Sequence, residues 1–259
     1  MALTEDDKQQ IQKAYRDVLA GKQIRARYGQ RLMIAEIAKY MGDIDENDGQ
    51  RTSPPATCVV EAGTGTGKTF AYLVPALKAG KKIVISTGTK ALQEQLFLKD
   101  LPRIRDALGT APALSLLKGR ANYLCLARLK AREADTNLLD PALLAEFTQV
   151  TRWAPRTESG DIAELPLPED AGVFPHVTST AENCLGRDCP HFEDCYLVKA
   201  RKKAMDADLV VINHHLFFAD MAIRDTGFGE GQSAARFVKS LGRNDFWQRG
   251  LQKAFRDLT

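Results

Sequence analysis

With 259 residues, the chain is 44% hydrophobic and 27% charged, and its 36 Lys and Arg residues against 33 Asp and Glu residues leave a net charge of +3. This composition excludes an intrinsically disordered chain, which combines low hydrophobicity with a large net charge. No apolar run reaches the roughly 20 residues that cross a bilayer, and the acidic first residues contain no apolar signal core. We therefore expect one or two globular units in the cytoplasm and no membrane partner.

The N-terminal part of the chain divides into a helical stretch and a polar stretch. Apolar residues at helical spacing predict helices over residues 5–41, with a break where Arg25-Ala-Arg-Tyr-Gly-Gln-Arg31 interrupts the pattern. Residues 42–55 are rich in Gly, Asp, Asn and Pro, which predicts a surface loop.

Three short β-branched segments predict buried strands at residues 57–61, 82–87 and 208–213. A helix is expected at residues 68–80, between the first two strands, and another helix follows the second strand. A strand, a helix and a strand at this spacing form a right-handed crossover in a parallel sheet, so the expected fold class is α/β.

A segment of different character separates the second and third strands. Residues 126–153 have helical apolar spacing, whereas residues 154–183 are rich in Pro, Gly, Asp, Glu and Thr and lack periodicity. We interpret residues 119–200 as an insertion between strands of the α/β domain, carrying its own cysteine site.

The segment Ala62-Gly-Thr-Gly-Thr-Gly-Lys-Thr69 follows the first predicted strand and opens a helix, which is the context that a phosphate-binding loop (P-loop) requires. Glycines let backbone N–H groups converge on phosphates, and the helix N-terminus adds its dipole. We expect Lys68 to neutralise charge between the β- and γ-phosphates and Thr69 to ligate Mg²⁺, so these two are the predicted catalytic residues. A glycine-rich turn without a ligand is the alternative. The predicted cofactors are ATP and Mg²⁺, and the loop residues predicted to bind them are Ala62, Gly63, Thr64, Gly65, Thr66, Gly67, Lys68 and Thr69.

Five cysteines are present, and three of them, Cys184, Cys189 and Cys195, lie within twelve residues. Without an export signal thiols stay reduced, so this group and Cys125 favour a metal or cluster site over disulfides. Four thiolates can hold either tetrahedral Zn²⁺ or a [4Fe–4S] cluster. Their wide and uneven spacing favours the cluster, with zinc and buried free thiols as alternatives. We expect Cys58, the fifth cysteine, to be an inert residue of a buried strand.

Basic and aromatic residues flank these cysteines, among them Lys118, Arg120 and Tyr123. Cations track phosphates and aromatic rings stack on bases, which predicts that these three side chains bind a single-stranded nucleic acid. A solvated basic face with aromatic rings packed around the cluster is the alternative.

The P-loop and the four cysteines together are more specific than either alone. Around them, the segments 59–69, 85–93, 117–125, 183–189 and 199–216 follow one another in motif order, over about residues 25 to 230. On these residues the chain resembles the iron–sulfur DNA helicases of the XPD/DinG type, and in detail their bacterial YoaA branch.

This resemblance implies a RecA-like P-loop domain with a parallel sheet and a helical insertion whose cysteines ligate an iron–sulfur cluster. It implies ATP-driven movement from 5′ to 3′ on single-stranded DNA, in bacterial replication and repair. The implied partners are single-stranded or forked DNA and a replication or repair protein.

The resemblance also implies roles for individual residues. Arg27 and Gln30 match the segment that contacts adenine. A second set, made up of Thr87, Thr89 and Lys90, matches the motif that contacts the single-strand backbone. The four cluster ligands match Cys125, Cys184, Cys189 and Cys195.

The sequence departs from this family in one respect that concerns catalysis. Relatives carry Asp-Glu-Ala-His, whose acidic pair holds Mg²⁺ and polarises water, but this chain contains no Asp-Glu-x-His, and its one Asp-Glu, Asp45-Glu46, lies in the polar N-terminal loop. A second motor domain is also absent. Because phosphoryl transfer depends on both halves of that cleft, we expect an incomplete motor domain that binds nucleotide weakly, hydrolyses little ATP and unwinds nothing. We also expect the sheet to have an exposed edge beside its centre.

We therefore divide the chain at residues 1–118, the first part of a nucleotide-binding motor domain, 119–200, the iron–sulfur insertion, 201–230, the continuation of the motor domain, and 231–259, a tail. In the tail, Trp247, Leu251, Phe255 and Leu258 predict an amphipathic helix. This helix could patch the core, bind a partner, or come from a frameshift, an internal deletion or the cloning of the gene.

Two other functions fit the sequence. One is a non-catalytic module that binds single-stranded nucleic acid as a scaffold. The other is a zinc-stabilised P-loop ATPase that does not act on DNA.

Overall fold

The computed structural model describes residues 4–20, 27–44, 46–47, 50–53, 58–78, 80–135 and 140–225. The chain separates into two compact units, which we call unit 1 (residues 1–115 and 206–259) and unit 2 (residues 116–205). The helix predicted in the tail lies outside the described residues. Among the residues described, no helix is both long and apolar enough to span a membrane.

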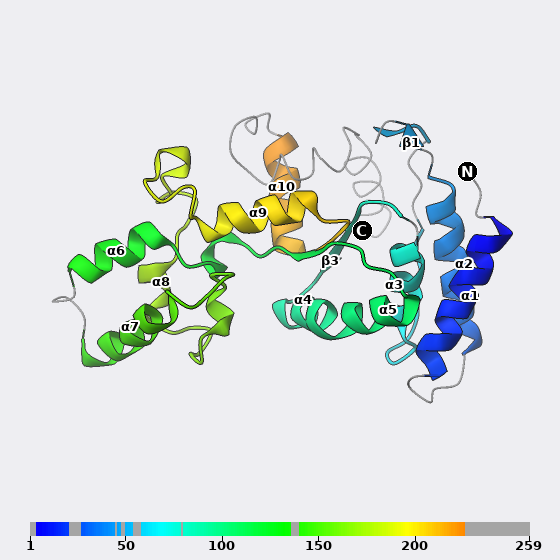
Figure 1. Ribbon diagram of the computed structural model, residues 1–259, viewed down its shortest axis with the longest axis horizontal. Helices are drawn as coiled ribbons and strands as arrows, with labels where there is room; N and C mark the ends of the chain where they lie inside the picture. Colours follow the sequence, from blue (N-terminus) through cyan, green and yellow to red (C-terminus); the bar gives the residue numbers. More distant parts are fainter. Residues whose placement is uncertain are drawn as a thin grey trace. The chain divides into compact units, whose positions relative to one another are not determined.

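A small sheet forms the centre of unit 1 (Figure 1). Its strands lie in the order β3 (Ile83–Thr87), β5 (Leu209–Asn213) and β4 (Leu114–Leu116). The parallel register of β3 and β5 runs from Ile83 opposite Leu209 to Thr87 opposite Asn213. Residues 209–212 are fully buried, as expected for the middle strand of a parallel sheet. The strands predicted at residues 82–87 and 208–213 are thus confirmed, whereas the short β4 was not predicted.

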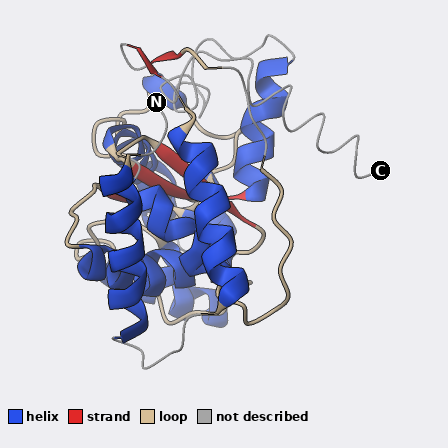
Figure 2. Ribbon diagram, turned by 90° about the vertical axis from the view of Figure 1, so that its right-hand side faces the viewer, coloured by secondary structure: helices blue, strands red, loops and turns tan. Residues whose placement is uncertain are grey.

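Helices surround this sheet in unit 1: α1 (Glu5–Ala20), α2 (Tyr28–Gly42), α3 (Lys68–Lys78), α4 (Lys90–Gln95), a π-helical turn (Leu96–Asp100), α5 (Leu101–Leu108) and α10 (His214–Asp225). Helix α3 packs against both α1 and α2, and α1 also packs against α5. Figure 2 views the unit from the side that α1 and α2 cover. The predicted helix at residues 68–80 is confirmed as α3, and α2 starts inside the stretch that was expected to break the helical pattern.

The strand predicted at residues 57–61 is wrong for its described part, because residues 58–61 form no regular secondary structure. Val59 is 78% exposed, and Cys58 is exposed rather than buried in a strand. A strand persists only where a neighbour pairs its backbone N–H and C=O groups. Among the described strands β3 pairs with β5 alone, so nothing described pairs with residues 58–61, and β3 lies at the edge of the sheet.

The predicted polar surface loop contains a short antiparallel pair. Strands β1 (Glu46–Asn47) and β2 (Gln50–Arg51) face each other, with Glu46 opposite Arg51. This short pair within the predicted loop was not expected from the sequence.

Unit 2 is mainly helical. It contains the short η2 (Arg120–Asn122), α6 (Leu126–Ala134), α7 (Pro141–Trp153), η3 (Ile162–Glu164), α8 (Phe174–Val177), η4 (Gly186–Asp188) and most of α9 (Tyr196–Asp206). Its core consists of Leu124, Leu129, Phe147, Val150, Leu165, Ala171, Val173, Phe174 and Val177. Part of this core comes from the segment that lacked periodicity in the sequence.

The helix predicted over residues 126–153 is two helices, α6 and α7. Helix α7 has a start signal of its own, because the side chain of Asp140 accepts a 2.9 Å hydrogen bond from the N–H of Leu143 and Pro141 occupies the first helical position. Apolar spacing continues across this boundary and therefore did not reveal it.

Candidate nucleotide-binding site and cysteine positions

The predicted P-loop lies directly before α3. Gly65 and Gly67 have φ angles of +75° and +80°, in the left-handed region that residues with a Cβ rarely adopt. The neighbouring Thr64 is exposed. The carbonyl of Gly67 accepts a 3.2 Å hydrogen bond from the N–H of Ala71, which joins the loop to the first turn of α3. The loop thus leads into a helix N-terminus, where unpaired N–H groups attract anions.

The side chain of Lys68 folds back over this loop. Its Nζ donates to the carbonyl oxygens of Ala62 and Gly63, at 2.6 and 2.9 Å. The hydroxyl of Thr66 donates to the same Gly63 carbonyl at 2.8 Å. Lys68 is exposed. Its ammonium group can therefore exchange neutral carbonyl oxygens for phosphate oxygens, with which its hydrogen bonds are stronger.

The hydroxyl of Thr69, the predicted Mg²⁺ ligand, interacts with Tyr72 one turn along α3. Burial raises the pKa of Tyr72, the hydrogen bond with Thr69 opposes this shift, and the charge of Asp100 adds to it. The phenol is therefore protonated at neutral pH, and it leaves the Thr69 hydroxyl beside a neutral neighbour.

Two residues of the α2 N-terminus hold the P-loop. Arg27 Nη1 donates to the carbonyl of Gly65 at 2.6 Å, and Gln30 Nε2 donates to the carbonyl of Gly67 at 3.0 Å. The Oε1 of Gln30 accepts a 2.6 Å hydrogen bond from the hydroxyl of Tyr15 in α1. A Cβ at Gly67 would lie 2.1 Å from Gln30 Nε2, so this close approach also requires glycine. Arg27 and Gln30 thus lie beside the loop predicted from sequence.

A cavity of about 630 Å³ adjoins this loop. Its walls come from α2, including Arg27 and Gln30, and from residues 58–62 and Thr66. This volume lies within the range of small-molecule sites. Partial burial, and then the charge of Glu36, raise the pKa of the Cys58 thiol on this wall.

The predicted DNA-contacting residues of unit 1 lie at the carboxyl end of β3. Thr89 caps α4, because its Oγ1 accepts a 3.1 Å hydrogen bond from the N–H of Leu92. The hydroxyl of Thr87 donates to the carbonyl of Thr89 at 3.2 Å, and Lys90 is exposed. Beside them, at the end of the parallel strand β5, His214 Nδ1 lies 2.7 Å from Ser86 Oγ. In open parallel sheets this edge is where ligands bind.

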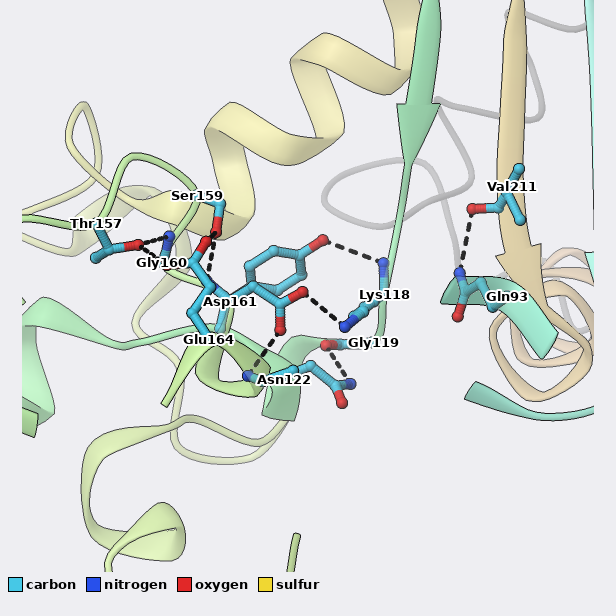
Figure 3. A network of polar contacts seen from close by, with 12 residues as sticks. Gln93, Lys118, Gly119, Asn122, Thr157, Ser159, Gly160, Asp161, Glu164 and Val211 are labelled. Atoms are coloured by element: carbon cyan, nitrogen blue, oxygen red, sulfur yellow. Dashed lines mark hydrogen bonds and ion pairs between the residues drawn. The ribbon is translucent and has the colours of Figure 1, made fainter. Parts of the chain in front are cut away.

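Lys118 and Tyr123, predicted to contact DNA, are instead buried in unit 2. Figure 3 shows Lys118 beside Asp161 in a network of polar contacts. Lys118 Nζ lies 2.6 Å from Asp161 Oδ2, and the hydroxyl of Tyr123 accepts a 3.1 Å hydrogen bond from the N–H of Lys118. Burial raises the pKa of Tyr123 to about 12. Only 4% of Lys118 and 5% of Tyr123 is exposed, so the prediction of DNA contact is corrected to a structural role for both. Arg120 is half-exposed.

Each of the four predicted cluster ligands is a free, partly buried thiol. The N–H of Cys125 donates to the carbonyl of Val177 at 2.8 Å, at the start of α6. The Sγ of Cys184 accepts a 3.5 Å hydrogen bond from the N–H of Gly186. Within the described part of the chain, no three Cys, His, Asp or Glu side chains are placed to hold a metal ion.

The chemistry of these thiols nevertheless fits a metal group. All four belong to unit 2, none forms a disulfide, and one sulfur already accepts a backbone N–H. In iron–sulfur clusters, such N–H···S hydrogen bonds help to set the reduction potential. The four residues therefore have the donor atoms that a thiolate-bound group needs, although their sulfur atoms do not lie together in a metal site in the described part of the chain.

Two contacts at these sites were missed by sequence reasoning. Tyr15 lies within the helical stretch predicted over residues 5–41 and was given no other role, and Asp161 lies in the aperiodic segment. Each acts through a partner distant in sequence, Gln30 for Tyr15 and Lys118 for Asp161. A buried polar tip on an apolar stripe signals the need for such a partner but not its identity.

Comparison with known proteins identifies relatives of this chain among the helicases. The DEAD/DEAH box helicase family matches residues 48–152. The chain is 56% identical to "ATP-dependent DNA helicase YoaA" of Haemophilus influenzae over 183 residues, which cover 70% of this chain and 29% of that protein. It is 55% identical to the protein of the same name from Escherichia coli over 173 residues, which cover 66% of this chain and 27% of that protein.

A third relative is "ATP-dependent helicase DinG" of Mycobacterium tuberculosis, 41% identical over 184 residues, which cover 62% of this chain and 28% of that protein. The chain thus spans less than a third of the length of these relatives. By this homology, the chain belongs to the family of the YoaA and DinG ATP-dependent DNA helicases, and its partial coverage fits their N-terminal part.

Proposed function

We propose that this chain is the nucleotide-binding part of an ATP-dependent DNA helicase that moves from 5′ to 3′ on single-stranded DNA. The observation that carries the proposal is the P-loop, with left-handed Gly65 and Gly67, Lys68 above its carbonyls and α3 directly after it. In this proposal the loop N–H groups and Lys68 bind the β- and γ-phosphates of ATP, and the Thr69 hydroxyl ligates Mg²⁺.

The chain alone is proposed to hydrolyse ATP slowly. Its sequence contains no Asp-Glu-x-His that could hold Mg²⁺ and orient water. Binding of phosphates requires only the loop, whereas transfer of the γ-phosphate requires charges placed around the transition state. We therefore expect nucleotide binding without appreciable turnover and without unwinding.

For unit 2 we propose that Cys125, Cys184, Cys189 and Cys195 hold a [4Fe–4S] cluster. When bound, such a group supplies structural cross-links between distant segments and a redox centre. The four thiols would hold the group as thiolates, so binding would release their protons, and the binding free energy would bring their segments together. The N–H of Gly186 would keep its bond to the Cys184 sulfur.

DNA is proposed to bind at the carboxyl end of β3. Thr87 and Thr89 offer hydroxyl groups there, and Lys90 offers an exposed cation, which suit a phosphate backbone. Arg120 of unit 2 remains a proposed contact because it is half-exposed. The proposed partners are single-stranded or forked DNA and a replication or repair protein.

Fluorescence anisotropy of a labelled single-stranded oligonucleotide tests this function. We expect salt-dependent binding by the full chain that changes on addition of ATP–Mg²⁺, and a salt slope lowered by about one in Lys90→Ala. Lys99→Ala, another exposed lysine in the same helical region, serves as the control. Absence of DNA binding would contradict the proposal.

The same preparations separate the two rival functions. DNA binding that ATP–Mg²⁺ leaves unchanged would favour the scaffold module. Metal analysis after oxygen-free purification addresses the other rival, because iron with labile sulfide supports the cluster, whereas a colourless protein with bound zinc supports a zinc-stabilised ATPase.

A further inference from the structure

A chain of two hydrogen bonds, one buried and one partly buried, joins α1 to the P-loop through Gln30. The Tyr15 hydroxyl lies 2.6 Å from Gln30 Oε1, and Gln30 Nε2 lies 3.0 Å from the carbonyl oxygen of Gly67. Only 5% of Tyr15 and 7% of Gln30 is exposed. Water therefore has little access to compete for these bonds.

The chemistry of the partners fixes which way the Gln30 amide faces. A backbone carbonyl only accepts hydrogen bonds, so the nitrogen of the amide must face Gly67. The oxygen then faces Tyr15, whose hydroxyl must donate. An amide turned over would place its oxygen against the Gly67 carbonyl and lose that bond, whereas the Tyr15 hydroxyl could still accept from the amide nitrogen. The Gly67 carbonyl therefore sets the orientation, and the bond with Tyr15 holds the amide in it.

In this orientation the amide keeps one N–H hydrogen and one lone pair of its oxygen for a ligand. Gln30 also lines the 630 Å³ cavity beside the loop. A donor and an acceptor side by side complement adenine, which offers N7 as acceptor and N6–H as donor. Guanine offers two acceptors, N7 and O6, so its O6 would face the amide oxygen without a hydrogen between them.

We propose that Tyr15 is a positioning residue that sets the purine preference of the nucleotide site by fixing the amide of Gln30. This inference rests on the proposed binding of ATP at the P-loop. Tyr15 is not among the residues that line the cavity beside the loop, so it acts on a bound nucleotide only through Gln30. Removal of this hydroxyl leaves Gln30 Oε1 without its buried donor, so the amide gains freedom to rotate and its preference for adenine weakens.

Equilibrium titration of the full chain with ATP–Mg²⁺, GTP–Mg²⁺ and tripolyphosphate–Mg²⁺ tests this role. The variant is Tyr15→Phe, which keeps the buried ring, and the control is Tyr28→Phe, whose side chain is 74% exposed at the start of α2. We expect the wild type to prefer ATP over GTP by about tenfold or more. Tyr15→Phe should lower that ratio by about three- to tenfold and leave the tripolyphosphate affinity unchanged, and Tyr28→Phe should match the wild type.

Three results would overturn the inference. The ATP to GTP ratio could be unchanged in Tyr15→Phe, or the wild type could fail to discriminate between the two purines. Alternatively, all three affinities could fall together in Tyr15→Phe, which would mean a structural role in supporting the loop. If the wild type binds neither ATP nor tripolyphosphate, the proposed function itself fails, and this outcome is distinct from the other three.

Discussion

The P-loop of unit 1 and the cysteines of unit 2 differ in how far the chain alone assembles them. The loop residues are consecutive, and their carbonyls already contact Lys68, Arg27 and Gln30. The backbone N–H groups of Cys189 and Cys195 make local hydrogen bonds and that of Cys125 bonds to the distant Val177, but the thiols are not grouped into a metal site among the described residues. A site built from one short segment follows from local conformation, whereas a site built from distant segments depends on what binds to it.

Unit 2 should nevertheless have a metal-independent fold. Lys118 is 4% exposed and lies 2.6 Å from Asp161, so Asp161→Ala removes the ion-pair partner of a buried ammonium group. We expect a loss of about 3 to 5 kcal/mol in the unfolding free energy of the metal-free unit, measured by denaturant titration followed through Trp153 fluorescence. The control is Asp194→Ala, which removes an exposed pair with Lys199 and should cost less than about 1 kcal/mol. Equal effects of both variants would show that metal-free unit 2 lacks this buried pair.

If the chain alone assembles the P-loop, the backbone of the loop must already have its binding conformation, and Gly67 is part of that conformation. Gly67→Ala places a Cβ at a φ of +80° and 2.1 Å from Gln30 Nε2. We expect about 2 kcal/mol of destabilisation and weaker ATP binding, measured by thermal unfolding and calorimetry. Gly29→Ala is the matched control, because a Cβ there meets nothing within 4 Å in a helix, so its stability should stay equal or rise. A neutral Gly67→Ala variant would contradict the described loop path.

A smaller effect is expected at alkaline pH in unit 2. Burial raises the pKa of Tyr123 from 10.0 to about 12, so the fold favours the protonated phenol. This contribution is fully present below about pH 10 and is lost as pH rises through about 12. Between about pH 8 and pH 11 we expect the wild type to lose about 1.4 kcal/mol more than Tyr123→Phe, as measured by urea unfolding. Parallel pH profiles of the two proteins would mean that Tyr123 is not buried as described.

The sequence revealed features whose cause is local. The segment 62–69 and helix α3 follow from glycine spacing and a helix start. The strands at residues 83–87 and 209–213 follow from their short β-branched apolar centres, of which only the second is fully buried. Residues 58–61 have the same character but form no strand, because pairing depends on neighbours that the pattern does not contain.

The sequence also did not reveal which polar residues, distant from one another along the chain, pair in the folded protein. Basic Lys118 and aromatic Tyr123 have the composition of a DNA-binding surface, yet Asp161 neutralises Lys118 in the interior. Residue type alone could not distinguish a DNA-binding surface from a buried ion pair. The carboxylate that decides between them, that of Asp161, lies 43 positions after Lys118 in a segment without periodicity. The same holds for Tyr15, whose hydroxyl meets Gln30 only after α1 and α2 have folded.

The most direct test of this account is calorimetric titration of the full chain with ATP–Mg²⁺. The wild type is compared with two variants, Lys68→Ala at the start of α3 and, as the control, Lys78→Ala at the end of the same helix. We predict heat of binding in the wild type and in Lys78→Ala, and an affinity at least about tenfold lower in Lys68→Ala, because the charged hydrogen bonds to phosphate are lost. Equal affinity in all three proteins, or no binding by the wild type, would contradict the assignment of residues 62–69 as a phosphate-binding loop.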